Sequence, residues 1–296
     1  MGHEVGDSLL CSVGVRIKSC LPESSHVARL GGDEFTAILC GHQGRELGGF
    51  YSKRIIAELS RSFSLEGNLV HVSACIGIAR LSQMGMTEGD MLRHADLALY
   101  EAKSRGLGEY KYFTEKMSLR VNREVRLTND LLSAIVNGEF ELLYQPIGHT
   151  GSGVVKKAEA LLRWHHPEFG LISPLELIPL AERSGAIDEI GLWVFETAAK
   201  QAKLWCSRGY PDIQISINAS PVQFRCYGQL YSWLRILDDL ELDGNAILIE
   251  ITEGVILEGN ADIQYAFERL HDRGIELALD DFGTEYSLCL ICESLT

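Results

Sequence analysis

The second half of the chain alternates short apolar segments with longer helical ones, and this alternation restricts the fold more than any other feature. Segments with the length and β-branched content of strands lie at 141–147, 158–164, 213–220, 246–252 and 276–282. Between them, 174–185, 190–206, 230–240 and 261–274 carry apolar side chains at helical spacing. The alternation predicts an α/β fold, either a parallel (β/α) barrel or a doubly wound sheet.

Polar side chains recur at the ends of these predicted strands. Glu159 opens one strand, Asn218 and Glu250 come late in the next two, and Asp280 with Asp281 ends the last. In a barrel of parallel strands the carboxyl-terminal rim brings such side chains together. Carboxylate and amide oxygens are hard ligands, so the set predicts a site for Mg²⁺ or Mn²⁺ rather than zinc.

The first half of the chain reads as a small α/β domain with a partly antiparallel sheet. A helical segment ends near Pro22, and the tight turn at 31–33 joins two strands in a hairpin. A helix at 52–62, a strand in the run 69–81, a helix at 88–106 and a short strand at 109–113 follow. A charged helical stretch then leads to Gly138. These patterns predict a first domain at 1–114, a helical connector at 115–137 and a second domain at 138–296.

The composition limits the partners of the chain. Its 296 residues carry a formal net charge of -14, which argues against nucleic-acid binding and suits a protein that holds divalent cations. No apolar run reaches the length of a membrane span and no secretory signal opens the chain, so we expect a cytoplasmic location, with any membrane anchor of the parent protein upstream of Met1.

Ordered motifs give both halves a family resemblance. The first half resembles a GGDEF domain, the diguanylate cyclase fold, through Arg29-Leu-Gly-Gly-Asp-Glu-Phe35, with support from Asp7, Ser73–Gly77 and Tyr100–Lys103. The second half resembles an EAL domain, the cyclic-di-GMP phosphodiesterase fold. Its matching motifs are Gln145-Pro146, Glu159-Ala-Leu-Leu-Arg163-Trp164, Asn218-Ala-Ser-Pro221, Glu250-Ile-Thr-Glu253 and Asp280-Asp-Phe-Gly-Thr284.

The EAL resemblance implies roles for the matching residues. Glu159, Asn218, Glu250 and Asp280 would hold one metal ion, and Asp281 would reach a second. Gln145 and Arg163 would contact cyclic-di-GMP, and Glu253 would anchor the loop that follows Asp281. That loop departs from the family pattern, because Glu285 stands where a glycine is usual.

The GGDEF resemblance is less complete. Asp33 matches one metal ligand, Asp7 a guanine-binding residue and Lys103 a phosphate-contacting residue. The strand that brings the second metal ligand would precede Met1, and Leu107 replaces an expected arginine. The product-inhibition motif RxxD is also absent, since Pro22–Ser25 occupies its place. We therefore expect no cyclase activity; binding of GTP stays open.

The EAL motifs stop after the fifth of eight expected strands. The catalytic lysine, the glutamate that acts as general base and a substrate-contacting glutamine belong to the later strands, and the sequence contains no match for them. After Leu288 the residues no longer follow the family pattern, which indicates a frameshift, a premature stop or a fragment. The expected fold is a partial GGDEF α/β sandwich followed by an incomplete, open EAL (β/α) barrel.

Three interpretations follow. The first is a fragment of a GGDEF–EAL protein whose parent hydrolyses cyclic-di-GMP to linear pGpG, with this chain inactive through truncation. The second is a catalytically dead module that binds a nucleotide or a protein partner. The third is a degenerate gene product without a stable fold. A homodimer also stays open.

Overall fold

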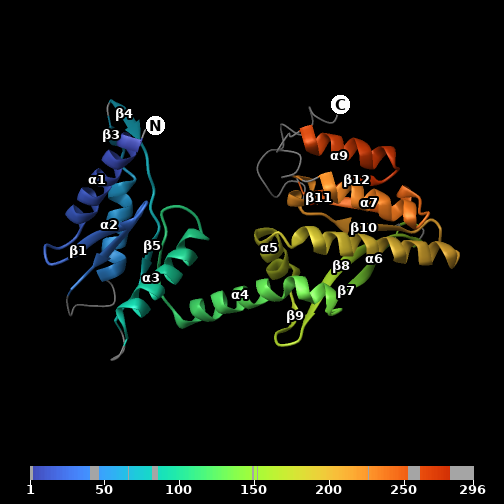
Figure 1. Cartoon of the computed structure of the whole chain (residues 1–296), viewed down its shortest axis with the longest axis horizontal. Coiled ribbons are helices and arrows are strands. Elements are labelled where there is room, and N and C mark those ends of the chain that lie inside the picture. Colours follow the sequence, from blue (N-terminus) through green and yellow to red (C-terminus); the bar gives the residue numbers. More distant parts are fainter. Residues whose placement is uncertain are drawn as a thin grey trace. The chain divides into compact units, whose positions relative to one another are not determined.

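The computed structural model describes residues 3–40, 47–65, 67–81, 86–148, 150–151, 153–225, 227–252 and 261–280. The chain divides into two compact units, Met1–Arg123 and Glu124–Thr296, so the boundary between them falls inside the helix α4 (Glu115–Val136) (Figure 1). Among the helices of the described part, none is long and apolar enough to cross a membrane.

In its described residues the first unit combines three helices, and the beginning of α4, with three two-stranded sheets. Its elements are α1 (His3–Cys20), β1 (His26–Gly31), β2 (Glu34–Ile38), α2 (Leu47–Leu59), β3 (Phe63–Leu65), β4 (Asn68–Val70), β5 (Ile76–Ile78), α3 (Glu88–Lys103) and β6 (Tyr110–Tyr112). β1–β2 and β3–β4 are antiparallel pairs, whereas β5 and β6 are parallel. The hairpin at 31–33 and the helices are confirmed, but the predicted strand at 69–81 is split between β4 and β5.

A small apolar core holds this unit together. Val13 and Ile17 of α1 pack with Ile55 and Leu59 of α2 and with Phe63 of β3, and all five side chains are buried. α3 begins at a capping box in which Thr87 accepts from the Asp90 amide and the Asp90 carboxylate accepts from the Thr87 amide. The start of α3 is therefore determined by neighbouring residues in the sequence. The packing of α1, α2 and β3 against one another is determined by the apolar core.

The second unit is built on one sheet with the strand order β12-β11-β10-β8-β7. The strands are β7 (Phe140–Gly148), β8 (Val155–His166), β10 (Gln214–Asn218), β11 (Ile247–Thr252) and β12 (Glu276–Asp280), and a short β9 (Gly170–Ile172) pairs with the end of β8. β8, β10, β11 and β12 run parallel, but β7 is antiparallel to β8. The predicted α/β fold is confirmed, and the expectation of uniformly parallel strands is wrong at β7.

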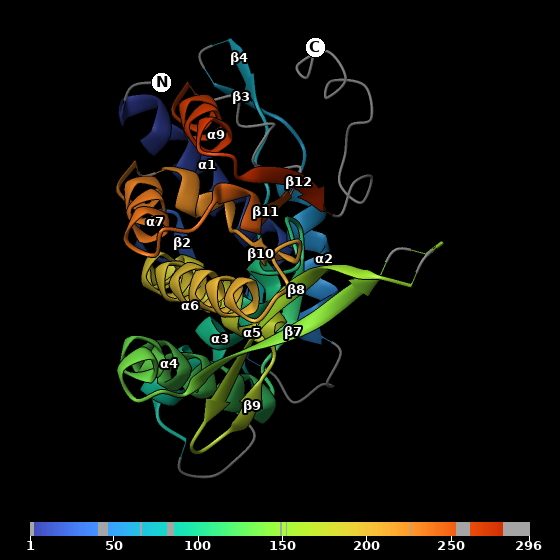
Figure 2. The same ribbon diagram turned by 90° about the vertical axis from the view of Figure 1, so that its right-hand side faces the viewer.

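Helices cover one face of this sheet (Figure 2). They are α5 (Pro174–Ser184), α6 (Ile187–Ser207), α7 (Tyr227–Asp239) and α9 (Ala261–Asp272), with short 3₁₀ turns η1 (Pro221–Arg225) and η2 (Gly244–Ala246). Alternate strand residues such as Ile215, Ile217, Ile247 and Ile249 are buried against them. Because strand side chains alternate between faces, the intervening polar residues of the same strands lie on the other face.

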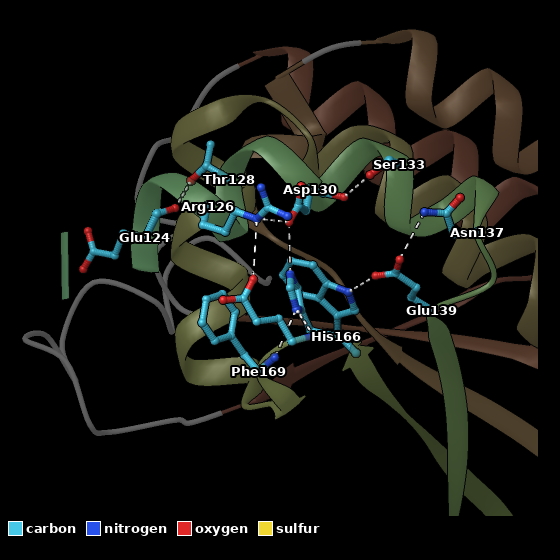
Figure 3. Close-up of polar contacts among 11 residues, drawn as sticks. Glu124, Arg126, Thr128, Asp130, Ser133, Asn137, Glu139, His166 and Phe169 are labelled. Atoms are coloured by element: carbon cyan, nitrogen blue, oxygen red, sulfur yellow. Dashed lines mark hydrogen bonds and ion pairs between the residues drawn. The ribbon is translucent and has the colours of Figure 1, made fainter. Parts of the chain in front are cut away.

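The second half of α4 is fastened to the carboxyl end of β8 (Figure 3). The fully buried His166 donates from Nε2 to Asp130 Oδ2 at 3.1 Å, because its Nδ1 already accepts from the amides of Glu168 and Phe169. The indole of buried Trp164 donates to Glu139 Oε2 at 3.0 Å. These bonds fix α4 to the strand that carries Glu159.

Candidate functional site

Four residues predicted as metal ligands lie on one face of the sheet, on four parallel strands. The prediction that Glu159 opens its strand is wrong, because β8 begins at Val155. Glu159 lies on β8, Asn218 on β10, Glu250 on β11 and Asp280 on β12. Asn218 is level with Glu250, while Glu159 is level with Ser216, two residues earlier on β10. Asp280 is level with Thr252, two residues beyond Glu250. The four residues therefore lie along a diagonal across one face of the sheet, from Glu159 on β8 to Asp280 on β12.

A hydrogen bond joins two of these residues directly. Asn218 Nδ2 donates to Glu159 Oε1 at 2.8 Å, across 59 residues of sequence. Bonds to charged acceptors are the stronger kind, so this contact holds the Glu159 carboxylate toward β10. The pair is the centre of the candidate site.

The carboxylate of Glu250 is in an environment that disfavours negative charge. Burial is the largest effect that raises the pKa of Glu250, and the neighbouring carboxylates of Glu159 and Asp280 raise it further. The Ser216 hydroxyl and the Lys157 ammonium act in the opposite direction. Glu250 thus lies near two further carboxylates, and a cation bound beside it would relieve this repulsion.

The donor set fits a hard divalent cation, although the cage is not complete within the described part. Carboxylate and amide oxygens are the ligands of Mg²⁺ and Mn²⁺. In the residues that the structure describes, no three acidic, histidine or cysteine side chains are already gathered as a metal-binding group. Asp281, predicted to reach a second ion, and Glu253, predicted to anchor its loop, lie outside the described residues.

The two predicted dinucleotide contacts also lie on β7 and β8. Gln145 is exposed and stands opposite Glu159 in the antiparallel β7–β8 pair. Arg163 is half-buried, four residues after Glu159 and opposite Glu141, and its guanidinium donates to the Leu162 carbonyl at 2.9 Å. Antiparallel partners and residues two or four apart share a face, so both side chains belong to the face that carries the acidic residues.

The residues predicted for the first unit lie on three separate elements. Asp7 is exposed on α1, Asp33 is exposed in the β1–β2 turn, and Lys103 is exposed in the last turn of α3. Arg29 donates to the Gly32 carbonyl at 2.8 Å, which stabilises the turn itself. This geometry gives the three residues no common centre comparable to the diagonal set on the larger sheet.

Sequence reasoning missed two features around the site. Ser216 is buried beside Glu159 and Glu250. Among the described residues its Oγ has no hydrogen-bond partner. Its hydroxyl is nevertheless near enough to Glu250 to lower the pKa of that carboxyl and so oppose the effect of burial. Its position two residues before Asn218 was a signal for a shared face. Glu182 of α5 accepts from the Ser220 hydroxyl at 2.6 Å, a contact that no local pattern predicts.

Two family models match the chain. The EAL domain matches residues 128–290, and the diguanylate cyclase GGDEF domain matches residues 1–109.

Curated relatives resemble almost the whole chain. The bifunctional diguanylate cyclase/cyclic di-GMP phosphodiesterase MucR of Pseudomonas aeruginosa is 33% identical over 99% of this chain. The cyclic di-GMP phosphodiesterase PdeR of Escherichia coli is 34% identical over 97% of it. The chain spans 43% of the length of each of these relatives.

Solved structures resemble about half of the chain. The PaMucR phosphodiesterase in a c-di-GMP complex is 36% identical, with a TM-score of 0.52, over 55% of this chain and 66% of that one. The EAL enzyme Bd1971, in a form bound to cAMP and cyclic-di-GMP, is 31% identical, with a TM-score of 0.52, over 57% of this chain and 46% of that one.

Proposed function

This chain belongs to the GGDEF–EAL family of cyclic-di-GMP signalling proteins, and on that premise we propose that its second unit binds Mg²⁺ or Mn²⁺ together with cyclic-di-GMP. The observation that carries the proposal is the set of four oxygen-bearing side chains on adjacent strands. Glu159, Asn218, Glu250 and Asp280 share one face of the sheet and lie along a diagonal across β8, β10, β11 and β12. The raised pKa of Glu250 is consistent with it: burial is the main cause, and the nearby carboxylates of Glu159 and Asp280 add to it.

The chain's own residues suggest how the dinucleotide would be held. The guanidinium of Arg163 would pair with a phosphate oxygen of the ligand, and the Gln145 amide would contact it from β7. The carboxylates of Glu159, Glu250 and Asp280 would hold the cation, which supplies charge that stabilises a phosphodiester transition state and lowers the pKa of water. Attack by water on one phosphorus, with cleavage of one ester bond, would convert the cyclic dinucleotide to pGpG.

For the polypeptide of these 296 residues taken alone, we propose binding with turnover at the background rate. No residue of the sequence matches the general base or the lysine of the family, and general-base assistance is typically worth about 10²–10⁴ in rate. We propose no conversion of GTP by the first unit, where Leu107 stands at the position of an expected arginine.

The test is a calorimetric titration of the 296-residue chain with cyclic-di-GMP, in Mn²⁺ and in EDTA, beside chromatography for pGpG. We expect Mn²⁺-dependent binding that Arg163→Ala weakens about tenfold or more, since it removes a charge-assisted phosphate contact. Absence of binding by the folded chain in Mn²⁺ would contradict the proposal. Rapid formation of pGpG would instead contradict the expected lack of turnover and leave the binding site standing.

A further inference from the structure

The turn that follows β10 is tied to its surroundings at several points. Asn218 is the last residue of β10, and the next amide, that of Ala219, donates to the Glu250 carbonyl at 2.9 Å. Ser220 then begins a compact turn in which its Oγ accepts from the Val222 amide at 3.2 Å. Two hydrogen bonds therefore fix the backbone after Asn218: one to β11, and one between the Ser220 side chain and the Val222 amide.

Glu182 controls where the Ser220 hydroxyl points. A hydroxyl has one proton, and here that proton goes to Glu182 Oε1 at 2.6 Å, a length typical of an O–H donor bound to a carboxylate. Since the proton is committed to α5, a lone pair of the same oxygen faces the Val222 amide. The contact joins the end of α5 to a turn that lies 38 residues away in sequence.

A second contact fixes the same turn against α6. The buried Gln223 accepts through Oε1 from the Ser220 amide at 2.9 Å. A Cβ atom at Gly191 would lie 1.8 Å from Gln223 Nε2, so the amide group occupies space that only a glycine on α6 leaves open. The turn after Asn218 is thus held by α5 through Glu182 and lies against α6, the helix that packs on β10.

We propose that Glu182 is a positioning residue for Asn218, acting through the Ser220 hydroxyl, an inference that rests on the proposed cation site. To bind a cation, the side-chain amide of Asn218 must be held in a fixed position. The backbone that positions it is anchored by the hydrogen bond between Ser220 and Glu182 as well as by β10. Groups that orient a metal ligand in this way are worth about 10- to 100-fold in metal affinity. The role needs a hydrogen-bond acceptor at position 182, not a charge.

The experiment compares Glu182→Leu, Glu182→Gln, Ser220→Ala and the Glu182→Leu/Ser220→Ala double variant in the 296-residue chain. Glu196→Leu on α6 is the control, because it removes an exposed carboxylate whose partner is Lys200. Two quantities are measured: Mn²⁺ affinity from the electron paramagnetic resonance signal of the free ion, and hydrogen exchange without metal at the three amides of segment 220–223, those of residues 220, 222 and 223. Exchange at β10 serves as the internal reference for global stability.

We expect Glu182→Leu and Ser220→Ala each to weaken Mn²⁺ binding about tenfold and the double variant to be no worse than either, because both remove one contact. Glu182→Gln keeps an acceptor oxygen and should bind within about twofold of the parent, as should Glu196→Leu. Exchange at 220–223 should accelerate roughly five- to tenfold in the first two variants, with β10 unchanged.

The inference is overturned if Glu182→Leu binds Mn²⁺ like the parent, if Glu182→Gln is as weak as Glu182→Leu, or if the two single effects add. Failure of the parent chain to bind Mn²⁺ would contradict the proposed cation site instead. In that case the exchange data still decide whether Glu182 orders the turn: unchanged exchange in Glu182→Leu would overturn the inference on its own.

Discussion

Asn218 Nδ2 donates to Glu159 Oε1 at 2.8 Å, which links the carboxyl end of β10 to the interior of β8 within the candidate site. In this arrangement the amide supplies the positive end of a dipole to a carboxylate that has other carboxylates nearby. A cation bound by Glu159 would take over that role. The contact therefore predicts how the site responds when the amide is changed.

Asn218→Asp places a second carboxylate directly against Glu159. Two charges at such a separation repel by roughly 1 kcal/mol or more, so we expect the metal-free chain to lose that much stability at pH 7.5 and to recover it in Mn²⁺. Urea denaturation in EDTA and in Mn²⁺ measures the difference.

The matched control is Asn137→Asp, in which Asn137 Nδ2 donates to Glu139 Oε1 at 3.1 Å in an exposed position. Both pairs are exposed, but Asn137 and Glu139 are not part of the proposed cation site, so the cost of this change should be indifferent to Mn²⁺. An equal, metal-independent loss in both variants would show that Asn218 belongs to no cation site.

Glu250→Gln should stabilise the metal-free chain at neutral pH. The pKa of Glu250 is raised in the folded chain, chiefly by burial, so ionisation costs more there than in the unfolded state. The wild type therefore loses stability as pH rises from the ordinary glutamate pKa of 4.5 through the folded value, and the loss persists above it.

Thermal unfolding in EDTA at pH 7.5 and near pH 4 tests this sign. The Gln variant should unfold at a higher temperature than the wild type at pH 7.5, and the gap should close near pH 4. Glu268→Gln, an exposed change on α9, should show no such gain. If Glu250→Gln were less stable than the wild type at pH 7.5, the pKa of Glu250 would not be raised in the folded chain.

His166→Ala should destabilise the second unit, because it removes a buried ring that satisfies Asp130 and two backbone amides. Leaving buried polar groups unpaired costs about 1–3 kcal/mol each, so a loss of roughly 2–4 kcal/mol is expected in urea denaturation. His165→Ala is the control: its side chain is 56% exposed, against 1% for His166, and should cost under about 0.5 kcal/mol. If the two variants lost similar amounts of unfolding free energy, the hydrogen bond between His166 and Asp130 of α4 would not stabilise the unit.

Gly77→Ala should disrupt the first unit. A Cβ there would lie 2.0 Å from the Ala95 carbonyl oxygen and 2.4 Å from the Leu99 amide nitrogen of α3, so β5 would have to move off the helix. We expect a loss of roughly 2 kcal/mol or more. Gly6→Ala on α1, with open space around it, should instead gain about 0.5–1 kcal/mol from helix propensity. A neutral Gly77→Ala would mean that β5 and α3 are not in contact.

Sequence predicted those parts of the fold that local chemistry determines. α5 begins where Ser173 accepts from the Leu175 amide and Pro174 takes the first helical position, and it ends at Gly185, whose φ of +80° suits glycine. The run 69–81 was harder, because pairing partners decide it. β4 pairs with the preceding β3, while β5 pairs with β6, which comes after α3.

The site divides in the same way. The recurrence of polar residues on successive predicted strands was enough to bring Glu159, Asn218 and Glu250 together as one candidate site. It could not reveal that Glu182 reaches Ser220, because that contact joins side chains 38 residues apart and depends on tertiary packing. Nor could it give the antiparallel direction of β7, which the short β7–β8 connection permits but apolar content alone does not specify.

The most direct test of the account compares the Mn²⁺ affinity of Glu159→Ala with that of Asp33→Ala in the same chain. Glu159 lies at the edge of the four-strand acidic set, whereas Asp33 is exposed in the β1–β2 turn of the other unit. The account predicts that Glu159→Ala loses most Mn²⁺ binding, by about tenfold or more, and that Asp33→Ala binds like the parent. Loss of binding in Asp33→Ala with full binding in Glu159→Ala would contradict it.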